Sequence, residues 1–200
     1  MKIGITINEV LRDFIGQFAY TYDKYIETTG IKEDEVTSFD LIKHFPFDSV
    51  DELNKFLYSE SSLEIFGHAD QLHENVMSLF NAFLKDIEDD EEHEIILISR
   101  EAIKSIPATL FFLSKLGCRA KHIQWVSQYE DKWNNVDVLV TANPRALESK
   151  PSGKISVKVN ASYNKDVKAD YEIDNIMEFM NDSIREKILN TKITNYEEID

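Results

Sequence analysis

The sequence predicts a three-layer α/β domain in which helices cover both faces of a parallel sheet. From about residue 94 onward, short apolar runs rich in β-branched residues alternate with segments of helical spacing. These runs are largely apolar, which is typical of parallel strands buried on both faces. Between the first strand with its helix and this region lies a long stretch, 31–92, without a convincing strand, and it predicts a helical insertion.

The predicted strands share a high content of Ile and Val and short length. In chain order they are Lys2–Ile7, Glu94–Ser99, His122–Val126, Val136–Val140 and Ile155–Val159. The first strand enters a polar turn at Asn8 and Glu9, so polar side chains follow it directly.

Helices are predicted where apolar residues recur every three or four positions. These segments are Val10–Tyr25, Val50–Leu57, His73–Ile87, Pro107–Leu116, Pro144–Glu148 and one or two helices within Ile173–Leu189. The charged block 86–92 predicts a loop. We therefore assign 1–14 and 93–182 to the α/β core, 15–92 to the helical insertion and 183–200 to a C-terminal helix or tail.

Composition excludes several classes of function. The 200 residues carry a net charge of −15, which repels nucleic-acid phosphates, so we expect no direct binding to nucleic acid. No apolar run approaches the roughly 18 residues that a membrane span needs, and we expect no membrane association. The single cysteine, Cys118, cannot form an internal disulfide, which favours a reducing compartment such as the cytoplasm.

The negative charge is concentrated in residues 1–90, where 19 acids and 7 bases give −12. One interpretation is a solvated surface that keeps the protein soluble. The other is a docking surface for a basic protein partner. The sequence leaves both open.

Four segments carry a family resemblance. Thr6-Ile-Asn-Glu-Val-Leu-Arg-Asp-Phe14 resembles the first motif of the haloacid dehalogenase (HAD) superfamily, in particular its 5′-nucleotidase and deoxyribonucleotidase branch, where it runs Asp-x-Asp-Gly-Val-Leu-x-Asp-Phe. Ile95–Ser99 is similar to the second motif, Asp131-Lys132 to the lysine motif and Asp137–Pro144 to the fourth motif. The resemblance covers nearly the whole chain and implies a HAD-like core with a helical cap inserted at 15–92.

The same resemblance implies that the hydrolytic chemistry is lost. In the family, one aspartate attacks phosphorus, a second gives a proton to the leaving group, and acids of the first and fourth motifs bind Mg²⁺. The matching positions here are Thr6, Asn8, and Thr141 with Ala142, none of which is a carboxylate. We therefore expect no catalytic residue, no metal and no cofactor, and interpret the chain as a pseudoenzyme.

Nearby acids offer one alternative. Glu9 stands where the family has glycine, and its carboxylate would be the basis of a residual Mg²⁺-dependent phosphatase or 5′-nucleotidase. Asp137 lies at the other end of its strand, about 13 Å from Thr141 at roughly 3.3 Å per residue, which is too far to help. Asp13 is interpreted as structural.

Two phosphate-binding positions of the family are retained. Ser99 matches the hydroxyl that hydrogen-bonds the phosphoryl oxygens, and Lys132 matches the lysine that neutralises them. One hypothesis is a sensor that holds phosphate or a nucleotide without cleaving it. The other is residual ancestry, in which Ser99 caps the next helix and Lys132 is a solvated loop lysine.

Aromatic residues gather early in the chain. Phe14, Phe18, Tyr22 and Tyr25 recur at helical spacing, which is typical of core or cap packing, whereas Tyr20 falls off that face. Exposed tyrosines beside acids are also good interface anchors.

A fold that is kept while its chemistry is lost suggests selection on its surface. The leading hypothesis is therefore a structural, assembly or protein-binding module whose partners are proteins. The Ile-, Lys-, Asn- and Glu-rich composition is compatible with an AT-rich bacterial or phage genome, and nucleotidases of this branch occur in phages. The concrete form of the hypothesis is a phage-encoded component of a virion or its assembly, located in the cytoplasm or in a phage particle.

Overall fold

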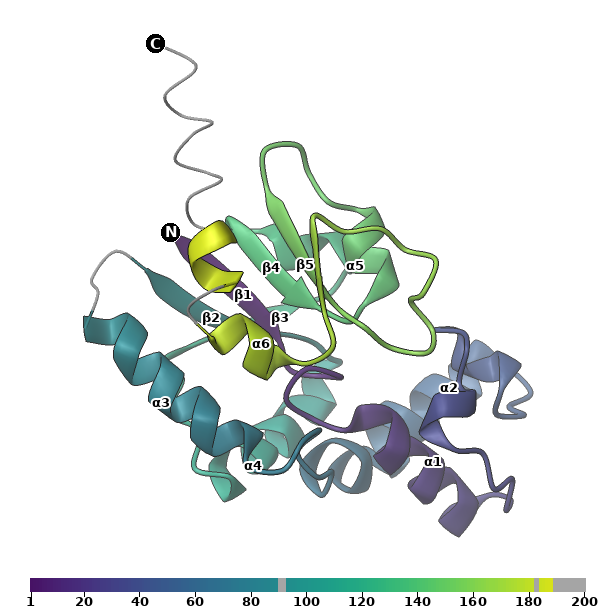
Figure 1. The fold of residues 1–200 in the computed structure, drawn as a ribbon. Coiled ribbons are helices and arrows are strands. Elements are labelled where there is room, and N and C mark those ends of the chain that lie inside the picture. Colours follow the sequence, from purple (N-terminus) through teal and green to yellow (C-terminus); the bar gives the residue numbers. More distant parts are fainter. Residues whose placement is uncertain (90–92, 182–183, 189–200) are drawn as a thin grey trace.

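The computed structural model describes residues 1–89, 93–181 and 184–188. Within these ranges six strands form one sheet: β1 (Lys2–Thr6), β2 (Glu94–Arg100), β3 (His122–Val126), β4 (Val138–Thr141), β5 (Ile155–Val159) and β6 (Tyr171–Ile173). Their order is β3-β2-β1-β4-β5-β6, and every neighbouring pair is parallel. Figure 1 shows this sheet with helices on both sides, which confirms the predicted parallel α/β class with a Rossmann-like arrangement.

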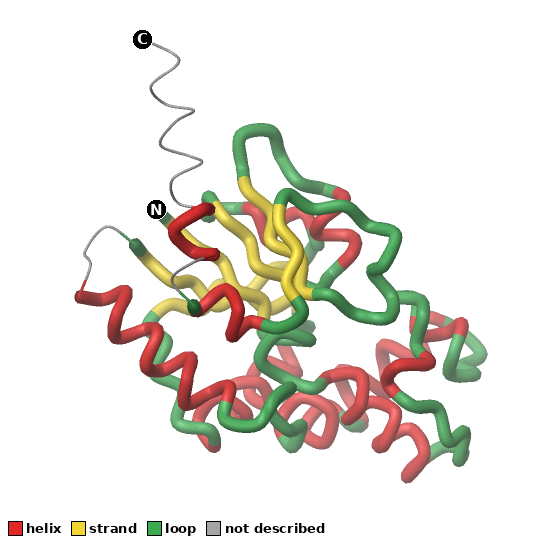
Figure 2. The backbone as a smooth tube through the Cα atoms, viewed as in Figure 1, coloured by secondary structure: helices red, strands yellow, loops and turns green. Residues whose placement is uncertain are grey.

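Between the strands, helices alternate with loops, which Figure 2 shows in red and green. They are α1 (Phe14–Tyr25), α2 (Val50–Lys55), α3 (Val76–Asp89), α4 (Ile106–Lys115), α5 (Pro144–Glu148) and α6 (Ile176–Met180). Across the described ranges, none of the helices has the length and apolar character that crossing a membrane requires.

Strand residues point alternately into two apolar layers. On one face Ile95 and Leu97 join the cluster that includes α3, α4 and α6. On the other face Ile96 and Ile98 pack with Trp133 and α5. The central strands β1, β2 and β4 are buried on both faces and are mainly apolar, as the sequence indicated, whereas the edge strands β3 and β6 contain exposed polar residues.

The chain between β1 and β2 contains helices and turns, and no strand among its described residues. In Figure 1, α1 and α2 lie beyond the carboxyl end of β1, to the right of the sheet. α3 belongs to the same predicted insertion, 15–92, but it packs against β2 and α6. Part of this segment therefore covers a sheet face, and the part with α1 and α2 lies beyond the strand ends.

The first helix begins at Phe14, and the predicted start at Val10 was wrong. The preceding residues form a tight loop in which the backbone N–H groups of Leu11 and Arg12 donate to the carbonyl of Ile7. The Asp13 carboxylate then accepts from the backbone N–H of Gly16 at 2.8 Å and caps the helix. Asp13 thus has the structural role predicted for it.

Two other boundaries differ from the prediction. α3 continues to Asp89, where a loop was expected from residue 86; residues 90–92 lie outside the described ranges. Tyr171–Ile173 forms β6, although Ile173 was predicted to open a helix; α6 begins at Ile176, capped by the Asn175 side chain. The predicted tail, 183–200, is described only at 184–188.

Candidate functional site

A cavity of about 420 Å³ opens at the carboxyl ends of the central strands. Its walls include residues at and after the end of β1, the last residues of β2, residues near β4, and residues of the helical segment within 39–58. The strand order reverses at β1, whose neighbours are β2 and β4. This switch point is where open parallel α/β sheets bind their ligands.

The structure brings most of the predicted site residues together. Those lining the cavity are Thr6, Asn8, Ser99 and Lys132. Thr141 and Ala142 are buried beside the cavity without lining it. Their convergence follows from the parallel sheet, because each residue lies at or just beyond the carboxyl end of a strand or in the turn before β4.

The two threonines predicted to replace metal-binding acids, Thr6 and Thr141, are joined by a hydrogen bond. The Thr6 hydroxyl donates to Thr141 Oγ1 at 3.1 Å, and Thr141 Oγ1 also accepts from the backbone N–H of Asn143 at 3.1 Å. Two hydroxyls at this distance satisfy each other, whereas two carboxylates would repel unless a cation lay between them. Asn8 Oδ1 is engaged as well, accepting from Arg12 Nε at 2.9 Å.

This donor set does not fit Mg²⁺, which prefers carboxylate oxygens. Elsewhere in the described ranges, no group of three His, Cys, Asp or Glu side chains could hold a metal ion. No metal chemistry is therefore assigned to the cavity.

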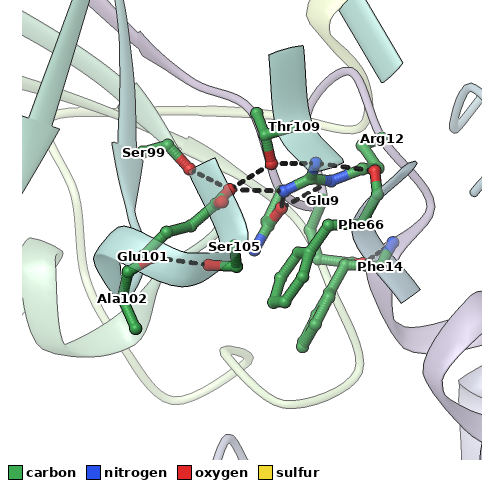
Figure 3. A network of polar contacts seen from close by, with 10 residues as sticks. Glu9, Arg12, Phe14, Phe66, Ser99, Glu101, Ala102, Ser105 and Thr109 are labelled. Atoms are coloured by element: carbon green, nitrogen blue, oxygen red, sulfur yellow. Dashed lines mark hydrogen bonds and ion pairs between the residues drawn. The ribbon is translucent and has the colours of Figure 1, made fainter. Parts of the chain in front are cut away.

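A buried ion pair lies beside the cavity (Figure 3). Arg12 Nη2 lies 3.0 Å from Glu101 Oε1, and both side chains have 0% exposure. Arg12 Nη1 donates to Thr109 Oγ1 at 2.6 Å and to the carbonyl of Phe66 at 3.0 Å. The Thr109 hydroxyl donates in turn to Glu101 Oε1. The charge of Glu101 is thus neutralised inside the protein.

The same network engages Ser99. Its hydroxyl donates to Glu101 Oε1 at 2.8 Å, as Figure 3 shows, so the oxygen can offer the cavity only its lone pairs. Sequence reasoning missed Arg12 and Glu101. The one local signal that Arg12 is unusual was its position directly after the apolar residues Val10 and Leu11.

Three cationic side chains line the cavity: Arg100, Lys132 and Arg145. None of them takes part in an ion pair within the described residues. They surround one ring, because the centre of Tyr129 lies 4.4 Å from Arg100 Cζ, 5.2 Å from Arg145 Cζ and 5.8 Å from Lys132 Nζ. Sequence reasoning found Lys132 and missed the two arginines, which belong to no motif.

Lys132 is the most deeply placed of these cations, with 6% exposure. Burial, with a smaller contribution from the Arg100 charge, lowers the pKa of Lys132 to about 7. Its position is held by the turn Glu130–Trp133, in which the Trp133 indole N–H donates to the carbonyl of Ala146 at 2.7 Å. Lys132 is therefore a buried amine and not the solvated loop lysine that one hypothesis proposed.

Glu9 lies at the edge of the cavity and faces the start of α1. Its backbone has φ of 57°, the left-handed conformation that favours glycine. Glu9 Oε1 accepts from the backbone N–H groups of Phe14 and Ile15, each at 2.8 Å. Burial above all, reinforced by the charges of Glu33 and Asp13, raises the pKa of Glu9 to about 8.

The variant Glu9→Gln tests whether burial raises the pKa of Glu9, because it keeps the accepting oxygen and removes the ionisable group. Between the ordinary pKa of 4.5 and about 8 the folded protein retains a proton that the unfolded chain releases, so stability falls as pH rises through this window. We expect the variant to exceed the wild type by about 1–3 kcal/mol near pH 9 and to match it near pH 4. Urea denaturation at both pH values measures the difference.

The exposed Glu27 provides a matched control. The variant Glu27→Gln is expected to follow the wild type at both pH values. Equal behaviour of the Glu9 and Glu27 variants would contradict the burial argument.

The sequence was also compared with known proteins. No family model matches the chain, and no curated protein matches it. The HAD resemblance therefore stays a prediction from the order and placement of its motifs.

Proposed function

We propose that the protein binds a small anionic organic molecule, such as a nucleotide or another phosphorylated compound, in this cavity without hydrolysing it. The observation that carries the proposal is that Arg100, Lys132 and Arg145 line the cavity and take part in no ion pair among the described residues. Lys132 is buried and Arg100 is half-buried, and cations at low exposure are unfavourable unless an anion compensates them. Arg145, which is exposed, adds a third positive charge beside them. In a chain of net charge −15, a cluster of three cations is better explained by binding of an anionic ligand than by a need for solubility.

The aromatic lining supports a ligand that also carries a ring. Phe14, Phe39, Tyr58, Tyr129 and Tyr163 line the cavity. The volume of about 420 Å³ lies in the usual range for small-molecule sites, roughly 300–1,000 Å³. A planar ring with an anionic substituent would match both the aromatic walls and the cations.

The absence of hydrolysis is proposed from Thr6 and Asn8, which stand where the family has its nucleophile and its general acid. The hydroxyl of Thr6 donates to another threonine and has no adjacent base, and Asn8 cannot transfer a proton at neutral pH. We further propose that the segment with α1 and α2 acts as a HAD-like cap over the site. The alternative of a residual phosphatase gains no support from this set of donors.

Thermal denaturation with inorganic phosphate and a panel of nucleoside monophosphates tests the function. A ligand at 100 times its Kd is expected to add about 2.7 kcal/mol to the stability of the folded state. We expect Lys132→Met to lose this increment, because it removes the most buried cation of the cavity. Lys158→Met removes a buried lysine that does not line the cavity and should keep the increment. Absence of any ligand-dependent increment in the wild type would contradict the proposal.

A protein-binding or assembly module, including one in a phage particle, is the second candidate function. It is favoured by exposed apolar side chains in and before α4, where Ile103 is 86% exposed and Leu110 and Phe111 are about half as exposed. This candidate expects no stabilisation by small anions, so the same titration separates the two.

A further inference from the structure

Lys132 differs from Lys158, the other lysine buried in the described part of the chain. Lys158 Nζ donates to the carbonyl of Val167 at 2.8 Å and pairs with Glu172 at 2.9 Å. Lys132 Nζ, within the same described ranges, has no hydrogen bond and no ion pair, and its residue lines the cavity. One buried amine is therefore satisfied by the protein, and the other is left for a molecule in the cavity.

The surroundings of Lys132 favour its neutral form. With a pKa of about 7, Lys132 is the free amine in roughly half of the protein molecules at neutral pH. An ordinary lysine, with a pKa near 10.4, has only about one part in 2,500 in that form. The free amine is the nucleophilic form of lysine.

We propose that Lys132 forms an imine with an aldehyde or ketone that carries an anionic group, and that Arg100 and Arg145 hold this group. The inference rests on the proposed anion binding and adds the class of ligand. Arg100 and Arg145 lie around the same Tyr129 ring as Lys132, so one small molecule can contact the amine at one end and the guanidinium groups at the other.

The step needs no oxidant, reductant or metal. The Lys132 nitrogen attacks the carbonyl carbon, and the carbonyl oxygen gains the proton lost from nitrogen to give a carbinolamine. This intermediate loses water, its oxygen leaving with the second amine proton, and a carbon–nitrogen double bond remains. Hydrolysis reverses the reaction and returns the free lysine.

Pyridoxal 5′-phosphate is a suitable probe, because it combines an aldehyde, a ring and a phosphate. The full-length protein is incubated with it at neutral pH, reduced with borohydride to fix any imine, and analysed by intact mass and peptide mapping. We expect one modified site, at Lys132. Pyridoxal, which lacks the phosphate, should label this site about tenfold more slowly, since it cannot use the charged contacts to the arginines.

Three variants make the test specific. Lys132→Met should lose the label; it replaces a desolvated amine by an apolar side chain of similar length, and its melting temperature verifies folding. Lys158→Met should keep the label. Arg145→Gln should reduce the advantage of pyridoxal 5′-phosphate over pyridoxal.

Labelling spread over exposed lysines, or unchanged in Lys132→Met, would overturn imine formation. Stabilisation by inorganic phosphate without labelling at Lys132 would overturn imine formation alone and leave the proposed function intact. Equal labelling of Lys132 by both aldehydes, without stabilisation by phosphate, would overturn the anion-binding function and with it the proposed ligand class.

Discussion

The variant Arg12→Met is expected to lower the free energy of unfolding by about 3–5 kcal/mol, because it leaves Glu101 charged and unpaired in the interior. Both side chains have 0% exposure, so water cannot replace the lost partner. The variant also removes the guanidinium contacts to Asn8, Thr109 and the carbonyl of Phe66. Urea denaturation followed by circular dichroism measures the change.

The double variant Arg12→Met/Glu101→Met is the control for the charge argument. When both ions of a buried pair are replaced by apolar side chains, stability is often retained or improved. We expect the double variant to be more stable than Arg12→Met alone by about 1–3 kcal/mol. Additive losses from the two single changes would show that packing, and not the unpaired charge, dominates.

The ion pair also shapes the proposed site. Glu101 lies close enough to accept the Ser99 hydroxyl, yet its charge is compensated by Arg12. The carboxylate therefore does little to cancel the positive charge of the nearby cavity. Without Arg12 it would oppose an anionic ligand, so Arg12→Met is expected to weaken phosphate binding as well as the fold.

Local signals account for the elements that sequence analysis placed well. β3 and β5 are short Ile- and Val-containing runs and have the predicted bounds. α5 also matches, since Pro144 occupies its first turn and the Asn143 side chain accepts from the backbone N–H of Ala146. Its start was thus determined by residues adjacent in sequence.

The elements that sequence analysis missed depend on contacts far along the chain. β6 has three residues and is defined by pairing with β5, so no periodicity could indicate it. The buried pair joins residues 12 and 101, and neither position carries a signal for the other. The same distinction applies to the residues of the site. Ser99 and Lys132 were predicted from motif positions, whereas Arg100 and Arg145 come together only in the folded protein.

The variant Phe18→Ala is expected to lower the free energy of unfolding by about 3–5 kcal/mol, the usual loss for a phenylalanine removed from a close-packed core. Phe18 has 0% exposure. Its ring centre lies 4.8 Å from that of Phe45 and 6.0 Å from that of Phe56, both in edge-to-face contact, and 6.3 Å from Phe47. These contacts join α1 to the chain on both sides of α2. The variant therefore removes packing within the segment that lies beyond the carboxyl end of β1. Chemical denaturation measures it.

Tyr20, two residues away on the same helix, is the matched control. Its side chain is 61% exposed, and Tyr20→Ala should change stability by no more than about 0.5 kcal/mol. Phe14, at the start of α1, lines the cavity, so loosening this helix in Phe18→Ala should also reduce stabilisation by phosphate, whereas Tyr20→Ala should leave it unchanged. If Phe18→Ala lost stability but kept the full phosphate increment, the packing of α1 would not contribute to phosphate binding.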